Sequence, residues 1–337
     1  MAEHPGTSND AAVGLDPDDF RTACLAIERS VRSVMVGQEA AVRGTLICLV
    51  LGAHALLEGV PGLGKTSMAR AFARAVGTAY SRIQFTPDLM PADITGTIVL
   101  LESGSHGPQL EFQPGPVFAG LVLADEINRA SPRTQSALLE AMQEGTVTVG
   151  RTTRDLPRPF SVLATQNPVE MQGTYPLPEA QLDRFLLKVE FEYPTANQLT
   201  EIVTTTLADP VAIAAAADPA QLLRMGALAR TVPAAAHVRD YASRLVIALQ
   251  PVAGAAAIVR DNVRLGPSPR GAQALTLAGN VTALLDGRHN LSLEDVRTVA
   301  RPALRHRLVL NFDAERTGVT ADLIIDEVVA ALPEDPR

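Results

Sequence analysis

The chain has 337 residues, of which 47 % are hydrophobic and 20 % are charged, and its formal net charge is −8. This composition excludes a mainly disordered chain, and the length allows two domains at roughly 150 residues per domain. The longest apolar runs fall far short of the ~20 residues that cross a bilayer, so no membrane insertion is expected. The acidic balance makes nucleic acid an unlikely partner.

The first seventeen residues, 1–17, are rich in Gly, Pro, Ser, Asn and Asp, which predicts a flexible tail. They have neither the basic start nor the apolar run of a signal peptide, so we expect a cytoplasmic protein. Two cysteines, Cys24 and Cys48, lie in apolar sequence of helical spacing, without a CxxC motif. We expect both to be reduced and buried, with no disulfide and no metal ligation.

An α/β domain is expected over residues 18–208. After two helical segments, Phe20–Val34 and Glu39–Leu51, short apolar runs alternate with amphipathic helical ones, which is typical of a mostly parallel sheet. The predicted strands are His54–Leu57, Tyr80–Phe85, Leu121–Ala124, Phe160–Thr165 and Leu186–Phe191, and the helices between them are Thr66–Val76 and Pro132–Gln143.

Two hairpins are expected as insertions into this α/β pattern, near residues 96–113 and 146–163. In the first, two strand-like segments flank the turn-forming residues Ser103–Pro108. In the second, Thr146–Val149 is expected to pair with Phe160–Leu163. Because insertions into a folded core usually survive as functional loops, we hypothesise that both hairpins contact partner proteins.

An all-helical domain is expected over residues 209–337, since no convincing strand follows Pro194. The alanine-rich segment Val211–Ala220 would be the hinge between the two domains. Helical spacing predicts helices at Ala196–Leu207, Pro219–Thr231, Val238–Leu249, Arg270–Leu285, Ser292–Leu304 and Thr320–Leu332. A basic run from Arg297 to Arg307 has acidic residues close by, so we expect a solvated or intersubunit face there.

The segment Gly59-Val60-Pro61-Gly62-Leu63-Gly64-Lys65-Thr66 fits the phosphate-loop pattern G-x-x-x-x-G-K-[ST]. Glycines allow the backbone to curl so that successive N–H groups point at phosphate oxygens. Lys65 would neutralise the charge of the β- and γ-phosphates, and the Thr66 hydroxyl would bind Mg²⁺. An apolar strand precedes the loop and a helix follows it, as this mechanism requires.

Polar residues follow two further predicted strands. The strand that begins at Leu121 ends in Asp125 and Glu126; the first could hold Mg²⁺ through water and the second could polarise an attacking water. Adjacent acids after a strand usually form only a solvated loop, but the phosphate loop upstream favours the catalytic interpretation. The strand that ends at Thr165 continues into Gln166 and Asn167, whose polar side chains could position that water.

These strings resemble AAA+ ATPases, and specifically the MoxR group, over nearly the whole chain from about Val34. Besides the phosphate loop, the matching strings are Val36-Gly37-Gln38, Thr86–Gly96, Phe112–Pro116, Leu123–Ala130, Ala164–Pro168, Pro178–Phe185 and Gly266–Arg270. The resemblance implies an AAA+ P-loop module with a parallel sheet flanked by helices, plus a helical lid. It also implies that ATP binds between the two domains and that active rings are usually hexameric.

The resemblance assigns roles to individual residues. Lys65 and Thr66 fall on the Walker A positions and Asp125 and Glu126 on Walker B, with Thr66 and Asp125 as the Mg²⁺ ligands. Asn167 matches sensor 1, Arg184 the arginine finger and Arg270 sensor 2, with Arg129 and Arg133 as rival fingers. Nucleotide contacts are further implied for Val36, Gly37, Gly59, Pro61, Gly62, Leu63, Gly64 and Ser67. Arg184 would be too far from its own nucleotide to act on it, so it would act on a neighbour's.

The expected function is therefore Mg²⁺-dependent hydrolysis of ATP to ADP and phosphate, used to remodel or mature partner proteins. The resemblance implies chaperone-like roles, often beside proteins with von Willebrand factor A domains. One alternative is a nucleic-acid motor, against which the acidic balance and the lack of an appended DNA-binding motif count. The other is a nucleotide-gated scaffold with little turnover, against which the intact Glu126 argues.

Overall fold

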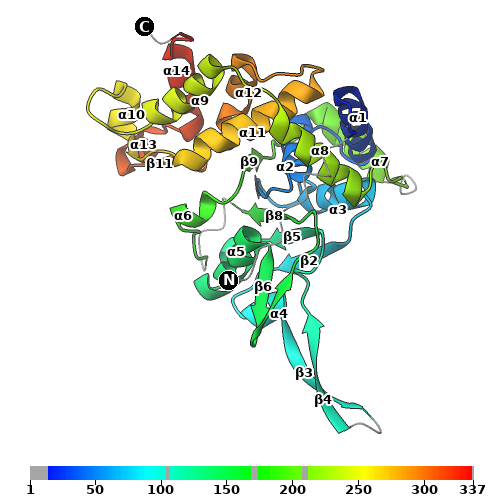
Figure 1. The fold of residues 1–337 in the computed structure, drawn as a ribbon. Coiled ribbons are helices and arrows are strands. Elements are labelled where there is room, and N and C mark those ends of the chain that lie inside the picture. The colour runs from blue at the N-terminus through cyan, green and yellow to red at the C-terminus, as the bar shows by residue number, and fades with distance from the viewer. Residues whose placement is uncertain (1–13, 104–106, 168–173, 207–211, 336–337) are drawn as a thin grey trace, which may run out of the picture.

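A five-stranded parallel sheet forms the centre of the N-terminal half of the molecule (Figure 1). The computed structural model describes residues 14–103, 107–167, 174–206 and 212–335. Across the sheet the strand order is β2-β5-β8-β1-β9, and every neighbouring pair is parallel. The strands are β1 (Ala55–Glu58), β2 (Tyr80–Gln84), β5 (Leu121–Asp125), β8 (Ser161–Gln166) and β9 (Leu187–Glu190).

Helices cover both faces of this sheet, which explains why its strands are almost continuously apolar. Successive side chains of a strand point to opposite faces. Leu57 therefore packs into one core cluster with Phe72, whereas Leu56 packs into a second cluster with Leu138. The first cluster draws on α1 (Pro17–Arg32), α2 (Glu39–Val50) and α3 (Lys65–Ala75), and the second on α5 (Pro132–Glu144). The predicted α/β architecture is thus confirmed.

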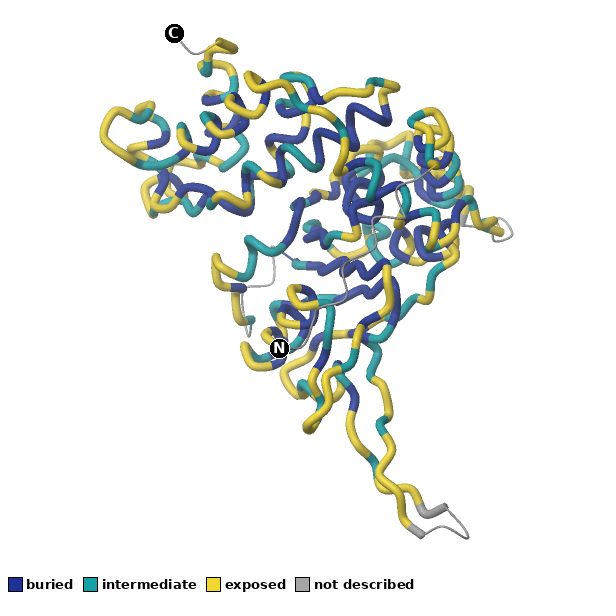
Figure 2. Tube along the Cα trace, viewed as in Figure 1, coloured by how far each residue is buried: buried dark blue, intermediate teal, exposed yellow. Residues whose placement is uncertain are grey.

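The first predicted hairpin is present and projects from the α/β part of the molecule (Figure 1). It consists of β3 (Gly96–Ser103) and β4 (Gly107–Pro114), and it follows the short helix α4 (Pro91–Thr95). Its register places Leu100 opposite Leu110. Most of the hairpin is exposed (Figure 2), and the centre of its turn lies outside the described residues.

The second predicted hairpin has a different partner strand. Thr146–Val149 (β6) pairs with Thr152–Asp155 (β7), not with Phe160–Leu163. The turn is made by Gly150, whose φ of +65° suits glycine, together with Arg151. The apolar run after Phe160 belongs instead to β8, which is buried between β5 and β1. A run that is apolar on both faces suits a central strand rather than a surface hairpin.

The C-terminal half is mainly helical, and each of its predicted helices is present. Their bounds, with those of the remaining helices, are η3 (Ile127–Arg129), α6 (Glu179–Leu182), α7 (Ala196–Thr206), α8 (Pro219–Thr231), α9 (Ala236–Ala248), α10 (Ala257–Asn262), α11 (Pro269–Leu285), α12 (Leu293–Leu304), α13 (Phe312–Thr317) and α14 (Ala321–Ala331). The region is not all-helical, because β10 (Val263–Leu265) pairs with β11 (Val309–Leu310). Strands this short give no periodic signal.

The helical half contacts the α/β half through residues that are far apart in the sequence. Arg21 of α1 donates to the carbonyl of Leu285 at 3.1 Å, and Arg305 pairs with Glu190 of the edge strand β9 at 2.8 Å. The expected boundary at 208/209 and most of the expected tail fall outside the described residues, so the division into domains stays a prediction. Within the described ranges, every helix is too short or too polar to span a membrane.

Candidate active site

The predicted phosphate loop connects β1 to α3. Gly62 and Gly64 have φ angles of +86° and +88°, in the left-handed region that favours glycine. At Gly59 a Cβ atom would lie 2.8 Å from the Cβ of Phe191, so only glycine fits there. Lys65 Nζ donates to the carbonyl of Gly59 at 2.5 Å, which shows that the loop wraps around its own lysine. The loop thus leads into the first turn of α3, where the amides of a helix have no acceptor within the helix, as an anion site requires.

A pocket of about 300 Å³ lies against this loop. The carboxyl ends of β1, β5 and β8 meet at the same edge of the sheet, where α/β proteins typically bind ligands. The pocket is lined by Pro61, Gly62, Gly64, Lys65, Thr66, Ser67, Asp125, Glu126, Thr165 and Asn167. The structure therefore brings together the five predicted residues Lys65, Thr66, Asp125, Glu126 and Asn167.

Asp125 is held by two partners. Thr165 Oγ1 donates to Asp125 Oδ1 at 2.6 Å and accepts from the amide of Glu126 at 2.8 Å. Arg82 Nη2 lies 2.6 Å from Asp125 Oδ2. The Thr66 hydroxyl and the Asp125 carboxylate line one pocket, and both are the hard oxygen ligands that Mg²⁺ prefers, so this donor set fits the expected ion. Burial lowers the pKa of Lys65, and the carboxylates of Asp125, Glu126 and Glu58 oppose that shift.

Glu126 has an unusual backbone and a fixed side chain. Its φ is +56°, a left-handed conformation that is strained for a residue with a side chain and that clusters at functional sites. Glu126 Oε2 accepts from Gln84 Nε2 at 3.0 Å and pairs with Arg129 Nη1 at 3.0 Å. Arg129, which was an alternative candidate for the arginine finger, therefore lies beside Glu126 of its own chain.

Arg82 and Gln84, which both lie on β2, were not predicted from the sequence as residues of the site. They reach the acids because β2 neighbours β5, with Gln84 in register with Asp125. Strand order is not contained in the local pattern of either strand. The missed Thr165 had a visible signal, since it ends an apolar strand in the polar string that also contains Asn167.

A second pocket, of about 380 Å³, adjoins the first and shares Pro61, Gly62, Gly64 and Ser67 with it. Its further lining is Val34, Met35, Val36, Gln38, Leu63, Tyr193, Pro194, Leu199, Ile202 and Thr205. The predicted Val36 and Leu63 thus line it, whereas Gly37 packs against Gln198, whose Nε2 would lie 2.8 Å from a Cβ on Gly37. A mainly apolar slot beside a polar, loop-lined pocket suits a flat base joined to phosphates.

Arg184 and Arg270 lie elsewhere, together in a third pocket of about 220 Å³. This pocket is also lined by His54, which precedes β1, whereas the phosphate loop follows β1. The two arginines are therefore at the amino edge of the sheet, opposite the phosphate loop. Among the described residues, the lining of both loop-side pockets ends at Thr205, so it includes no side chain of the helical half, and binding of ATP between the two halves of one chain stays a prediction.

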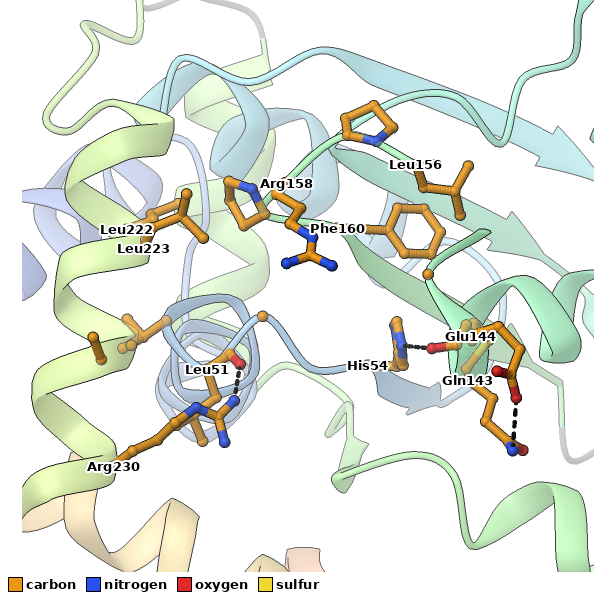
Figure 3. Close-up of a pocket in the computed structure, with 18 residues that line it drawn as sticks. Leu51, His54, Gln143, Glu144, Leu156, Arg158, Phe160, Leu222, Leu223 and Arg230 are labelled. Atoms are coloured by element: carbon orange, nitrogen blue, oxygen red, sulfur yellow. Dashed lines mark hydrogen bonds between the residues drawn. The ribbon is translucent and has the colours of Figure 1, made fainter. Parts of the chain in front are cut away.

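Another cavity, of about 680 Å³ (Figure 3), shares His54, Met142 and Gln143 with this third pocket. His54 lies at its wall, where its Nε2 donates to the carbonyl of Met142 and its Nδ1 accepts from the amide of Val162, both at 3.0 Å. Burial lowers the pKa of His54 to about 4, so the ring stays neutral near pH 7. Arg230 donates to the carbonyl of Leu51 at 2.8 Å. Both polar side chains are committed to the backbone.

Comparison with known proteins matches both halves of the chain. Residues 54–187 match the ATPase family associated with various cellular activities (AAA), and residues 255–328 match the AAA lid domain. The uncharacterized protein YeaC of Bacillus subtilis (strain 168) and the chaperone MoxR1 of Mycobacterium tuberculosis are each 41 % identical over 307 residues. These alignments cover 90 % of this chain and 92 % and 81 % of the two relatives. A solved structure from Cytophaga hutchinsonii has 36 % identity and a TM-score of 0.87, covering 94 % of this chain and 96 % of that one.

Proposed function

Because the chain belongs to the MoxR family of AAA+ ATPases, we propose that it binds ATP and hydrolyses it to ADP and phosphate in a Mg²⁺-dependent reaction. The observation that carries this proposal is the pocket at the carboxyl edge of the sheet. There a phosphate loop, two strand-end acids and the buried Asn167 face one another, next to an apolar slot of a size that suits a base.

In this proposal each residue of the pocket has a separate task. Lys65 and the amides of the loop bind the phosphates and neutralise their charge. Thr66 and Asp125 hold Mg²⁺, which supplies further positive charge at the phosphate oxygens when it is bound. Glu126 accepts a proton from the attacking water, and Asn167 orients that water. Before Glu126 can accept this proton, its Oε2 must give up its hydrogen bond to Arg129 or to Gln84, because both side chains donate to that oxygen.

We further propose that catalysis is shared between subunits of a homo-oligomeric ring, with six subunits as the expected number. Arg184 and Arg270 lie at the sheet edge opposite the phosphate loop of their own chain, which supports action on the nucleotide of a neighbour. A guanidinium presents a fixed positive fork to phosphate oxygens as charge develops on them.

The energy of hydrolysis would be used for chaperone-like remodelling or maturation of client proteins. This part rests on the relative that is named a chaperone and on the exposed β3–β4 hairpin, which offers a surface away from the catalytic pocket. Proteins with von Willebrand factor A domains are the client class that the family resemblance implies.

Paired binding and turnover measurements on the wild type and on Glu126→Gln test the catalytic proposal. The variant should bind a fluorescent ATP analogue like the wild type but release almost no phosphate, because an amide cannot accept the proton. Near-normal phosphate release by the variant would remove Glu126 from its role. A wild type that binds ATP without turnover at any Mg²⁺ concentration would favour the scaffold alternative.

A further inference from the structure

Arg307, which follows the C-terminal end of α12, is a buried cation outside the proposed nucleotide pocket. The sequence predicted a solvated or intersubunit face for the whole basic run from Arg297, and this is wrong at its end. The Arg307 side chain is only 3 % exposed, and His306 is also buried. Removing a guanidinium from water costs several kcal/mol, so a buried arginine persists only where its donors are matched.

Most of the hydrogen bonds of Arg307 go to one short segment, Asp183–Leu186, and its Nη1 also contacts His306 Nε2 at 2.9 Å. Arg307 Nε donates to Asp183 Oδ1 at 2.8 Å, and Nη2 donates to the carbonyls of Asp183 and Phe185 at 3.2 and 2.7 Å. Its Nη1 donates to the carbonyl of Leu186 at 3.1 Å and to that of Ala303 in α12. The planar guanidinium group of Arg307 thus hydrogen-bonds to the residues before and after Arg184 in the chain.

Arg184 itself has few contacts of its own. In the part of the chain that the structure describes, its side chain makes no ion pair, and its buried Nε has no hydrogen-bond partner. The segment that carries it lies between the four-residue helix α6 and the edge strand β9. The position of the Arg184 side chain is therefore set mainly by the contacts of its neighbours.

Besides its contact with Arg307, Asp183 makes a second set of contacts with the helical half. Its Oδ2 accepts from Ser268 Oγ at 2.7 Å and lies 3.6 Å from Arg270 Nη1. Arg307 follows the end of α12 and Ser268 caps the start of α11, so residues at the ends of two helices of that half contact the residue that precedes Arg184. A shift of the helical half relative to the sheet must consequently move Arg184.

We propose that Arg307 is a positioning residue that holds Asp183–Leu186 in place and so presents Arg184 to the nucleotide of the neighbouring subunit. This inference rests on the proposed function, in which Arg184 acts between subunits. It adds that the placement of the helical half of one subunit controls hydrolysis in the next. Arg307 lines the same pocket as Arg184, and in this inference its effect on hydrolysis passes through Arg184.

The test compares Arg307→Lys with a matched control, Arg305→Lys. Lysine keeps the charge at 307 but cannot hold four acceptors in one plane. Arg305 is also largely buried and also pairs across to the sheet, with Glu190, but within the described ranges it makes no hydrogen bond or ion pair with Asp183–Leu186. Since a misplacement of about 1 Å can cost roughly 10²-fold in rate, Arg307→Lys should lose ten- to a hundredfold of its turnover. Arg305→Lys should stay within about twofold, and both should bind ATP normally.

Mixing of variants distinguishes positioning of Arg184 from simple support of the fold. A Glu126→Gln subunit cannot hydrolyse its own ATP but offers an intact Arg184, so mixing it with Arg307→Lys should restore turnover. An Arg184→Ala subunit offers none, so its mixture with Arg307→Lys should be no more active than Arg307→Lys alone. The double variant Arg184→Ala/Arg307→Lys should be no slower than Arg184→Ala alone. Recovery in the Arg184→Ala mixture, or normal turnover of Arg307→Lys, would overturn the inference.

Two further measurements keep the result decisive. If Arg307→Lys does not fold or assemble, by thermal melting and size-exclusion chromatography, Asp183→Asn takes its place in the same mixtures. This variant conserves shape and removes the carboxylate that Arg307 Nε contacts. If Arg184→Ala itself keeps full turnover, the proposed sharing of catalysis between subunits fails. If only Arg184→Ala loses turnover while the positioning variants do not, the inference alone fails.

Discussion

Arg82 Nη2 lies 2.6 Å from Asp125 Oδ2, so a cation of the protein already contacts the carboxylate that is proposed to hold Mg²⁺. The same Nη2 donates to Gln84 Oε1 at 2.5 Å, and Gln84 in turn donates to Glu126. The two acids are therefore linked through side chains of β2. An ion that separates Asp125 from Arg82 should therefore also change the hydrogen bonds of Glu126.

Arg82→Ala should make the enzyme need less Mg²⁺, because the arginine and the ion compete for one carboxylate. The Arg82 side chain is 42 % exposed, and an exposed pair contributes at most about 1 kcal/mol, so the half-saturating Mg²⁺ concentration should fall by no more than about fivefold. Binding of a fluorescent ATP analogue at increasing Mg²⁺ measures this directly. A rise in the Mg²⁺ requirement would show that Arg82 supports the site rather than competing there.

Lys65→Ala should weaken ATP binding by roughly 10- to 100-fold, since hydrogen bonds to charged groups contribute about 1.5–3 kcal/mol. Lys65 Nζ is already placed at the centre of the loop by the carbonyl of Gly59. Isothermal titration with ATP measures the loss, and Arg70→Ala, on an exposed face of α3, provides the control. Equal affinities of Lys65→Ala and wild type would place the phosphates elsewhere.

Acid should destabilise the fold through His54. Its pKa is about 4 in the folded chain, below the 6.5 of an unperturbed histidine, so between these values the unfolded chain binds the proton and the folded one does not. The stabilisation is complete above pH 6.5 and is lost as the pH falls towards 4, by about 3 kcal/mol in total. The pKa of the buried His306 is also lowered and adds to the same trend.

His54→Gln should therefore flatten the dependence of stability on pH, even though it lowers stability at pH 7.5. The measurement is denaturant unfolding of both proteins between pH 4.5 and 7.5. Parallel curves for the two proteins would assign the acid sensitivity to other groups.

What the sequence predicted well is what depends on neighbours along the chain. The phosphate loop and the acids at 125 and 126 are local patterns, and each is found where the pattern indicates. The same holds for the strands that are apolar on both faces. Such strands must lie in a covered parallel sheet, whatever their order in it.

What the sequence could not predict depends on which elements meet in space. Arg82 reaches Asp125 only because β2 lies beside β5, and Arg307 is buried only because α12 packs against the loop before β9. The wrong partner for Thr146–Val149 has the same origin. The polar strand Thr152–Asp155 carries a weaker signal than the apolar run that follows, although the nearer strand makes the tighter turn.

The β3–β4 hairpin should be dispensable for basal catalysis. Leu100 and Leu110 face each other near its tip and are 62 % and 74 % exposed, an apolar pair that water disfavours unless something covers it. Leu100→Ser/Leu110→Ser should keep basal ATP turnover within about twofold, since surface changes rarely alter stability by more than ~0.5 kcal/mol. The variant built on Glu126→Gln should recover fewer client proteins in pull-downs than Glu126→Gln alone. Loss of basal turnover would instead make the hairpin part of the ring contacts.

Arg184 and Arg129 should differ in whose nucleotide they serve. An added cation at the γ-phosphate accelerates comparable phosphoryl transfers by ~10³–10⁵, so Arg184→Ala should bind ATP and lose nearly all turnover. Mixing it with Glu126→Gln should restore part of the activity, because some interfaces then pair an intact acid with an intact Arg184. Arg129 pairs with Glu126 of its own subunit at 3.0 Å, so any loss in Arg129→Ala should not be rescued by Glu126→Gln. Rescue of Arg129→Ala but not of Arg184→Ala would reverse the two assignments, and ordinary turnover by a strictly monomeric preparation would reject the shared site altogether.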